Sequence, residues 1–203
     1  MAYAGLGSTW DPPAGDREAM RGVARRVGAH LQREHGYRGA FGVDGVLTAD
    51  GFRPTELNTR MSAGATALSE VDRRFFTFLQ AVLVTGTDPG LTAADVEALV
   101  PAMDAARVGK VIAFSERTAD VPQESYPVTW DGRSFARTEE ETGNLFQVGS
   151  APSGLFARVE PCAAVVPGQR LAPVNAALLR LLDASYGTSF GPMEPAPDVR
   201  AVT

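Results

Sequence analysis

Two acidic residues and an asparagine carry the donor atoms of a possible cation site. Asp44 lies in an apolar, glycine-rich run, and Glu56 and Asn58 lie in the next run, beyond the dipeptide Asp50-Gly51. Asp-Gly between two such runs predicts a hairpin, which would bring both carboxylates to one end of a two-stranded ribbon. Carboxylate and amide oxygens suit Mg²⁺, which commonly takes one or two carboxylates and completes its shell with water and phosphates. The spacing therefore indicates a magnesium site.

Strand geometry groups these side chains further. Because side chains on a strand alternate between faces, Glu56 and Asn58 share a face, and Arg60 joins them if the strand continues. Leu57 then faces the other side, as a core residue. A guanidinium beside carboxylates can stabilise charge on a transferring phosphoryl group or an oxyanion. The same spacing also fits a simpler interpretation, in which Asp44 ends a strand, Glu56 and Asn58 are solvated, and Arg60 pairs with one of them.

The segment resembles the metal-binding end of the ATP-grasp ligases. In that superfamily a glycine-rich strand, G-x-x-G-V-D/E, is followed by a turn and by a strand that ends in E-x-N-x-R. The matching elements here are residues 39–44, 48–51 and 56–60, and the resemblance covers residues 1–85. Beyond residue 84 the chain is similar to the extra C-terminal region of actinobacterial ATP-grasp proteins of the pheganomycin-type peptide ligase kind.

The resemblance implies roles for particular residues. It makes Asp44, Glu56 and Asn58 the Mg²⁺ ligands, and Arg60 the catalytic contact to phosphate or oxyanion. Asn58 and Arg60 would also bind the cofactor, which the resemblance implies to be ATP. The implied activity is that of a carboxylate–amine ligase, which joins a small-molecule or peptide carboxylate to an amine through an acyl-phosphate.

One part of the superfamily pattern is missing. ATP-grasp enzymes hold the nucleotide between two lobes, but Met1 comes shortly before Asp44, and Lys110 is the only lysine. The sequence contains no G-x-x-x-x-G-K-[ST] run that could replace the missing half. We therefore expect the C-terminal part of a longer enzyme, which is incomplete for ATP binding on its own and is catalytic only if the N-terminal half completes it. The alternative is a non-catalytic binding or interaction module that retains a ligase half-fold.

Composition restricts the kinds of protein and partner that the sequence allows. The chain has 203 residues, of which 44% are hydrophobic and 21% charged, so it is long enough for a substantial core. A net charge of −5 argues against a nucleic-acid partner, although five arginines recur along one predicted helix. These five alternate with acidic and apolar residues, which indicates a solvated helix face: Arg17, Arg21, Arg25, Arg26 and Arg33. One cysteine excludes an internal disulfide, and the absence of a signal pattern or an apolar span predicts a cytoplasmic protein without membrane contact.

The predicted fold class is α+β, with the C-terminal half of an ATP-grasp fold followed by a smaller β-rich α+β region. The first region would be residues 1–89, with helices at 16–35 and 67–84 around the hairpin and a flexible or tight loop at 62–66. The second, 90–191, opens with a capping-box helix at 92–106 and closes with a helix at 173–186. Between them we expect strands at 110–115, 126–130, 134–138, 145–148 and 155–166. Residues 192–203 would be a loosely ordered tail.

Overall fold

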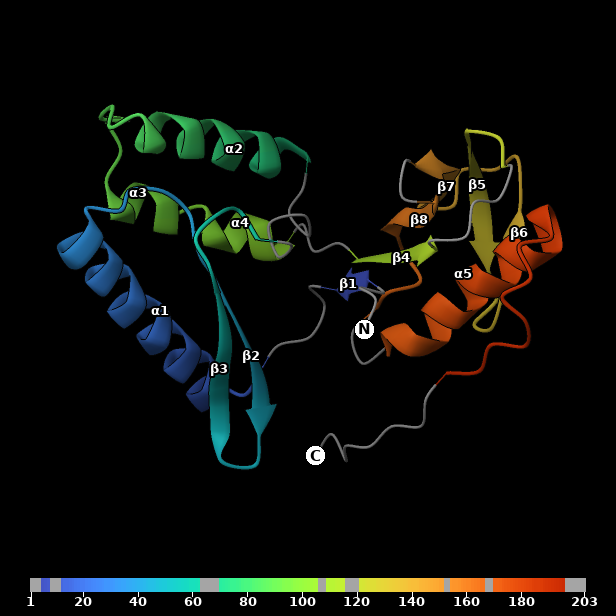
Figure 1. Cartoon of the computed structure of the whole chain (residues 1–203), viewed down its shortest axis with the longest axis horizontal. Helices are drawn as coiled ribbons and strands as arrows, with labels where there is room; N and C mark the ends of the chain where they lie inside the picture. Colours follow the sequence, from blue (N-terminus) through green and yellow to red (C-terminus); the bar gives the residue numbers. More distant parts are fainter. Residues whose placement is uncertain are drawn as a thin grey trace. The chain divides into compact units, whose positions relative to one another are not determined.

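The computed structural model describes residues 5–7, 12–62, 70–105, 109–115, 121–151, 154–166 and 170–195. Its helices and antiparallel strands confirm the predicted α+β class (Figure 1). The chain divides into two compact units, which we call unit 1 (residues 1–10 and 108–203) and unit 2 (residues 11–107). The predicted boundary near residue 90 falls inside unit 2, because the two short helices that follow it belong to that unit.

Unit 2 begins with helix α1, Ala14–His35, which lies beside the hairpin of β2 (Gly42–Thr48) and β3 (Gly51–Asn58). As predicted, Gly36 ends the helix: its φ is 59° and its N–H donates to the Gln32 carbonyl oxygen at 3.0 Å. Glycine takes this left-handed conformation without the steric cost of a Cβ atom. The helix thereby delivers the chain directly into the glycine-rich run that leads to β2.

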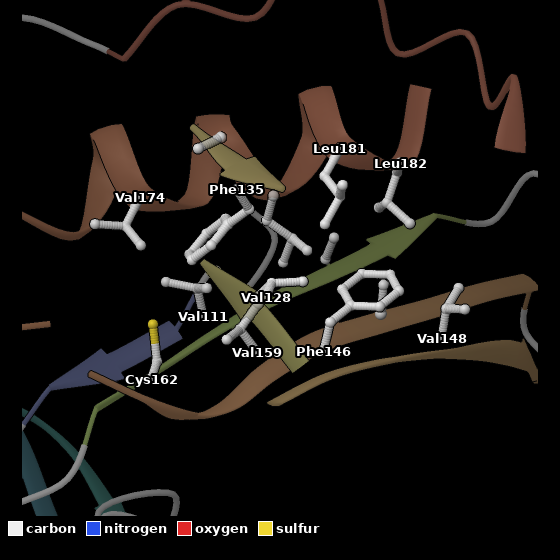
Figure 2. Packing of buried hydrophobic residues seen from close by; sticks show 14 of the residues in the cluster. Val111, Val128, Phe135, Phe146, Val148, Val159, Cys162, Val174, Leu181 and Leu182 are labelled. Atoms are coloured by element: carbon white, nitrogen blue, oxygen red, sulfur yellow. The ribbon is translucent and has the colours of Figure 1, made fainter. Parts of the chain in front are cut away.

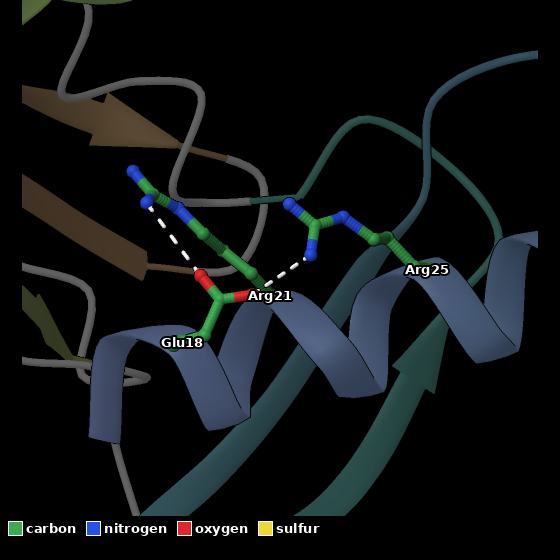
Figure 3. Close-up of polar contacts among 3 residues, drawn as sticks. All are labelled: Glu18, Arg21 and Arg25. Carbon is green, nitrogen blue, oxygen red and sulfur yellow. Dashed lines mark hydrogen bonds and ion pairs between the residues drawn. The ribbon is translucent and has the colours of Figure 1, made fainter. Parts of the chain in front are cut away.

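The polar side of α1 carries ion pairs along its solvent face (Figure 3). Arg25 Nη1 lies 2.8 Å from Glu18 Oε1, and Arg21 Nη1 lies 3.9 Å from Glu18 Oε2. All three side chains are more than half exposed, so these pairs contribute little to the free energy of unfolding. This arrangement confirms that the arginines paired here belong to a solvated helix face.

The second half of unit 2 contains α2 (Glu70–Val84), α3 (Ala93–Glu97) and α4 (Val100–Ala105). The predicted capping box is present, since Thr92 Oγ1 accepts from the Asp95 N–H and the Asp95 carboxylate accepts from the Thr92 N–H. The predicted single helix at 92–106 is nevertheless broken into α3 and α4. Pro101 lacks the N–H that would bond the Glu97 carbonyl in a continuous helix. The start predicted for α2, residues 67–69, lies outside the described residues.

Burial in unit 2 is shallow. Leu31 is the only hydrophobic side chain classed as buried among the described residues of this unit. Leu57, which we predicted to be a core residue, is 45% exposed, and Phe78 on α2 is 70% exposed. The prediction for Leu57 was wrong, because strand and helix periodicity identify an apolar face but not whether another element covers it.

Unit 1 is a six-stranded antiparallel sheet with the strand order β1-β4-β8-β7-β5-β6. Its elements are β1 (Gly5–Gly7), β4 (Gly109–Ser115), β5 (Glu124–Trp130), β6 (Phe135–Arg137), β7 (Asn144–Ala151), β8 (Gly154–Cys162) and helix α5 (Leu171–Tyr186). The predicted strands and final helix are all present, although the last strand ends at Cys162 and not at residue 166. The short N-terminal strand β1 pairs with β4, so the sheet combines a strand that precedes unit 2 in sequence with strands that follow it.

Helix α5 packs on one face of this sheet and forms the main hydrophobic core with it (Figure 2). Alternate residues of β7 and β8 point towards the helix, and Phe146 at the centre is fully buried. Its ring lies 4.9 Å from the ring of Tyr126 and 6.2 Å from that of Tyr186. The opposite set of alternate residues on these strands forms the outer face of the sheet.

Asp183 near the end of α5 holds the chain that follows the helix. Its carboxylate accepts hydrogen bonds from Thr188 Oγ1 at 2.6 Å and from the N–H groups of Phe190 and Gly191, each at 2.8 Å. Desolvation raises the pKa of the Asp183 carboxyl, but these hydrogen bonds together outweigh it and hold the pKa below its ordinary value. Residues 196–203 of the predicted tail lie outside the described residues.

This lowered pKa predicts an acid-dependent loss of stability. The unfolded carboxyl titrates near ~3.9, so the stabilisation is present above that pH and is lost as pH falls through the lower folded pKa. Asp183→Asn should unfold at lower urea concentration at neutral pH and should lose less stability than the parent between about pH 4 and about pH 2. Urea midpoints of the parent and of Asp183→Asn, measured at neutral pH, at about pH 4 and at about pH 2, test this prediction. Equal pH dependence in both proteins would contradict it.

Of the helices that the structure describes, none has both the length and the apolar character needed to cross a bilayer.

Candidate metal centre

The predicted hairpin is present, and its turn is short. Residues 49 and 50 form a two-residue loop between Thr48 and Gly51, which are paired in the ladder. Gly51 has a φ of 91°, a conformation that glycine adopts readily. Thr48 Oγ1 donates to the Gly51 carbonyl oxygen at 3.0 Å and accepts from the Asp50 N–H at 3.2 Å. The Asp-Gly dipeptide therefore places the turn as predicted.

A bulge in the ladder decides which side chains meet. Gly45 pairs with Pro54, but Asp44 pairs with Glu56, so Thr55 is an extra residue on β3. Without that extra residue Asp44 would lie opposite Thr55, and Glu56 would point to the other face. Proline has no N–H to donate to the ladder, and bulges are one of the few places where a strand tolerates it. Pro54 thus marks the register shift that puts both carboxylates on one face.

The two carboxylates form a direct cross-strand pair. Residues that lie opposite each other in an antiparallel ladder have Cβ atoms roughly 4.5–5.5 Å apart, and Mg–O bonds are about 2.1 Å long, so this pairing is compatible with one cation between the two side chains. Asn58 Nδ2 donates to Asp44 Oδ2 at 3.0 Å, which joins the amide to the same face. The structure therefore brings Asp44, Glu56 and Asn58 together near the open end of the hairpin.

The two carboxylates of this pair carry like charges at close range. Asp44 and Glu56 are exposed, and like charges directly opposite each other destabilise an antiparallel pair. Within the described part of the chain, no basic side chain forms an ion pair with either carboxylate. A divalent cation would replace repulsion by attraction to both groups.

Arg60 is the predicted site residue that the structure does not bring to this group. Strand β3 ends at Asn58, so the alternation of faces does not extend to Arg60. Its Nη1 donates to the carbonyl oxygen of the next residue, Met61, at 3.3 Å. The side chain is exposed and its proposed contact to phosphate stays a prediction.

Ser62 is a neighbour of the site that the sequence did not single out as a ligand. A Cβ atom added to Gly42 would lie 2.7 Å from Ser62 Cβ and 2.8 Å from Ser62 Oγ, and 4.0 Å from Asn58 Cβ. Gly42 pairs with Asn58, so Ser62 lies over the same face as the candidate ligands. The G-x-x-G spacing was the available signal, because glycine in a strand often marks close approach of another group.

Gly42→Ala tests this packing. Its Cβ would overlap Ser62, so Ser62 must move away from the face that carries Asp44 and Asn58. We expect a loss of roughly 1–3 kcal/mol in hairpin stability and displaced amide signals at Ser62 and Asn58 in ¹⁵N spectra. Gly15→Ala on α1 is a matched control, since an added Cβ there meets nothing within 4 Å. Equal spectra at Ser62 in the parent and Gly42→Ala proteins would contradict the close approach.

The first glycine of the motif has a different role. Gly39 has a φ of 131°, and a Cβ there would lie 2.8 Å from Gln80 Oε1 of α2. The same Gln80 oxygen accepts a hydrogen bond from the Ala40 N–H. The two glycines therefore allow close approach of Gln80 at residue 39 and of Ser62 at residue 42, where the chain enters β2.

The candidate ligands on the hairpin all offer oxygen atoms to a metal. In the described ranges there is no group of three or more histidine, cysteine, aspartate and glutamate residues that could hold a metal. The hairpin group has two carboxylates and completes its set with an amide, which suits a hard cation such as Mg²⁺ rather than Zn²⁺.

Comparisons with models of known protein families, with curated proteins and with solved structures gave no match to this chain.

Proposed function

We propose that this chain binds Mg²⁺ on the β2–β3 hairpin and serves as the metal-binding part of an ATP-dependent carboxylate–amine ligase of the ATP-grasp type. The cation site is supported by one observation above all: the bulge at Thr55 makes Asp44 and Glu56 direct cross-strand neighbours on one face. The ligase class is supported by the E-x-N-x-R string and its upstream acid, which resemble the superfamily pattern.

The residues would divide the chemistry among them. Asp44 and Glu56 supply the charge that holds the cation, while Asn58 adds an amide oxygen and orients Asp44 through its hydrogen bond. When bound, Mg²⁺ would neutralise charge on the phosphates of ATP during transfer to the substrate carboxylate. Arg60 would stabilise negative charge at the acyl-phosphate, from which the amine displaces phosphate to form the amide. No protein nucleophile is required, because positioning and charge neutralisation dominate phosphoryl transfer.

The cation site is tested with Mn²⁺ as a paramagnetic substitute for Mg²⁺. Titration into the ¹⁵N-labelled chain should broaden the amide signals of residues 42–46 and 56–58 before all others, and Mg²⁺ should compete. Asp50→Asn at the turn of the same hairpin is the matched control, because its side chain is 84% exposed and lies at the other end of the ribbon. Uniform broadening, or broadening centred on the turn, would overturn the site.

The ligase class needs a separate test. A protein extended by the coding sequence upstream of residue 1 should release phosphate from ATP only when both an acid and an amine are supplied. Glu56→Gln should abolish that activity, whereas Asp50→Asn should retain it. A cation site without such activity in the extended protein would leave the binding module as the function.

One observation favours that second function. Large apolar side chains are exposed in unit 2, with Val46 at 55%, Phe78 at 70% and Val84 at 61%. Contiguous exposed apolar patches mark surfaces that contact another protein segment, and these three side chains would anchor such a contact. A binding module would use the hairpin and α2 for such contacts and would need no ATP.

A further inference from the structure

The outer face of the sheet in unit 1 contains a pocket of about 490 Å³. It lies over strands β5, β7 and β8, and most of it is lined by two adjacent rows of side chains that cross the ladder on the side away from the α5 core. One row runs through Ser125, Gln147 and Arg158, and the other contains Gln123, Gly149 and Phe156. The volume is within the range of pockets that hold small organic ligands, about 300–1,000 Å³.

Gly149 makes the pocket hollow, and neither conformation nor packing requires glycine there. Its φ lies outside the left-handed range, and an added Cβ would make only ordinary contact, 3.5 Å from Gln123 Cγ. Glycine inside a strand weakens the strand and often marks close approach of a ligand or another backbone. The missing side chain therefore leaves room beside the ring of Phe156 that a larger residue would fill without strain.

Arg158 is held in place at the edge of this space. Its Nε donates to Gln147 Oε1 at 2.5 Å, its Nη1 lies 2.8 Å from Glu160 Oε2, and its guanidinium carbon lies 5.7 Å from the Phe156 ring centroid. These contacts orient the guanidinium, and among the described residues none of them uses Nη2. An oriented guanidinium is suited to bind a carboxylate.

We propose that this pocket binds a small monocarboxylate with an aromatic or branched apolar group. The apolar group would lie over Gly149 against Phe156, and the carboxylate would accept from Arg158, with the amide of Gln147 and the hydroxyl of Ser125 at hand. A monoanion fits better than a phosphate dianion, because Glu160 already balances part of the Arg158 charge. The site belongs to unit 1 and does not depend on the proposed hairpin cation.

The probe is N-acetyl-L-phenylalanine, titrated into the full ¹⁵N-labelled chain. We expect saturable shifts confined to amides around residues 147–150 and 156–158. The uncharged N-acetyl-L-phenylalaninamide should bind about tenfold more weakly, as expected for loss of a charge-assisted hydrogen bond. No saturable shift up to ~10 mM, which corresponds to a binding free energy weaker than about −3 kcal/mol, or equal affinity for the two compounds, would overturn the proposal.

Two variants and one control locate the site. Gly149→Val fills the hollow and should weaken binding at least ~10-fold while the sheet stays folded. Thr129→Val, an exposed position on the same face outside the pocket, should bind as the parent does. If Gly149→Val does not fold, Arg158→Gln serves in its place and should remove the preference for the acid over the amide. Unchanged affinity in a folded Gly149→Val protein, or an unchanged acid preference in Arg158→Gln, would refute the assignment.

Discussion

Replacing Asp44 by asparagine should weaken Mn²⁺ binding about 30-fold and, without metal, stabilise the hairpin. A divalent cation about 4 Å from a unit charge in water gains about 2 kcal/mol, which corresponds to the expected loss of affinity. Removing one of two like charges that lie directly opposite should recover roughly 0.2–1 kcal/mol in the metal-free protein. The measurements are Mn²⁺ titration and urea unfolding of the parent and variant in the presence of a chelator.

This prediction is specific because Mn²⁺ affinity should fall while the stability of the metal-free hairpin should rise. If Asp44 were a solvated residue that holds no cation, its replacement would change neither Mn²⁺ affinity nor hairpin stability. If Asp44 only accepted the hydrogen bond from Asn58, its replacement would destabilise the hairpin. Asp50→Asn removes the same charge from the same hairpin but at the turn, where its Arg53 partner is 3.9 Å away and well exposed. It should leave Mn²⁺ affinity unchanged. Lower stability of Asp44→Asn in chelator would count against mutual repulsion as the state of the metal-free site.

The hairpin could be predicted from sequence because its signals are local. Asp50-Gly51 sets the turn, and alternation puts Glu56 and Asn58 on one face whatever the rest of the chain does. The partner of Asp44 is not local: counting back from the turn places Thr55 opposite it, and only the bulge beside Pro54 moves Glu56 into that position. Pro54 was a visible signal for the bulge.

The sequence does not reveal which separate segments of the chain come into contact. The approach of Ser62 to Gly42 and of Gln80 to Gly39 depends on how loops and α2 return to the hairpin. The position of Arg60 depends on where β3 stops, which is among the least certain features of a sequence prediction. Leu57 has the alternation of a core residue, yet its burial requires a covering element that periodicity does not specify.

Unit 1 was more predictable because pattern and burial agree there. Strands β7 and β8 alternate, and their inward residues meet the apolar stripe of α5 that contains Leu178 and Leu182. The outer face of the same strands was not predicted as a pocket, since the glycine at 149 looks like ordinary loop composition until the ladder register places it between Gln123 and Phe156. The proposed binding on this face thus depends on strand register, which sequence patterns leave open.

Phe146→Ala should destabilise unit 1 by roughly 3–5 kcal/mol, a large part of the 5–15 kcal/mol that stabilises a typical domain. Phe146 is fully buried, and its ring centroid lies 4.9 Å from that of Tyr126 and 6.2 Å from that of Tyr186, so its loss leaves a cavity in the core. Phe78→Ala is the matched control: its ring is 70% exposed, and the change should cost within about 0.5 kcal/mol.

Cys162 provides the measurement, because it belongs to the same core and is the only cysteine (Figure 2). Burial raises the pKa of its thiol to about 11, against the smaller opposing effect of N–H groups of Ala164 and Val165. At mildly alkaline pH the folded thiol is therefore protonated as well as shielded, and a thiol reagent reacts only when unit 1 opens. Phe146→Ala should raise the labelling rate by about two to four orders of magnitude where opening is in rapid equilibrium, and Phe78→Ala should leave it unchanged. Equal rates in the two variants would mean that the sheet–helix core does not govern the opening of unit 1.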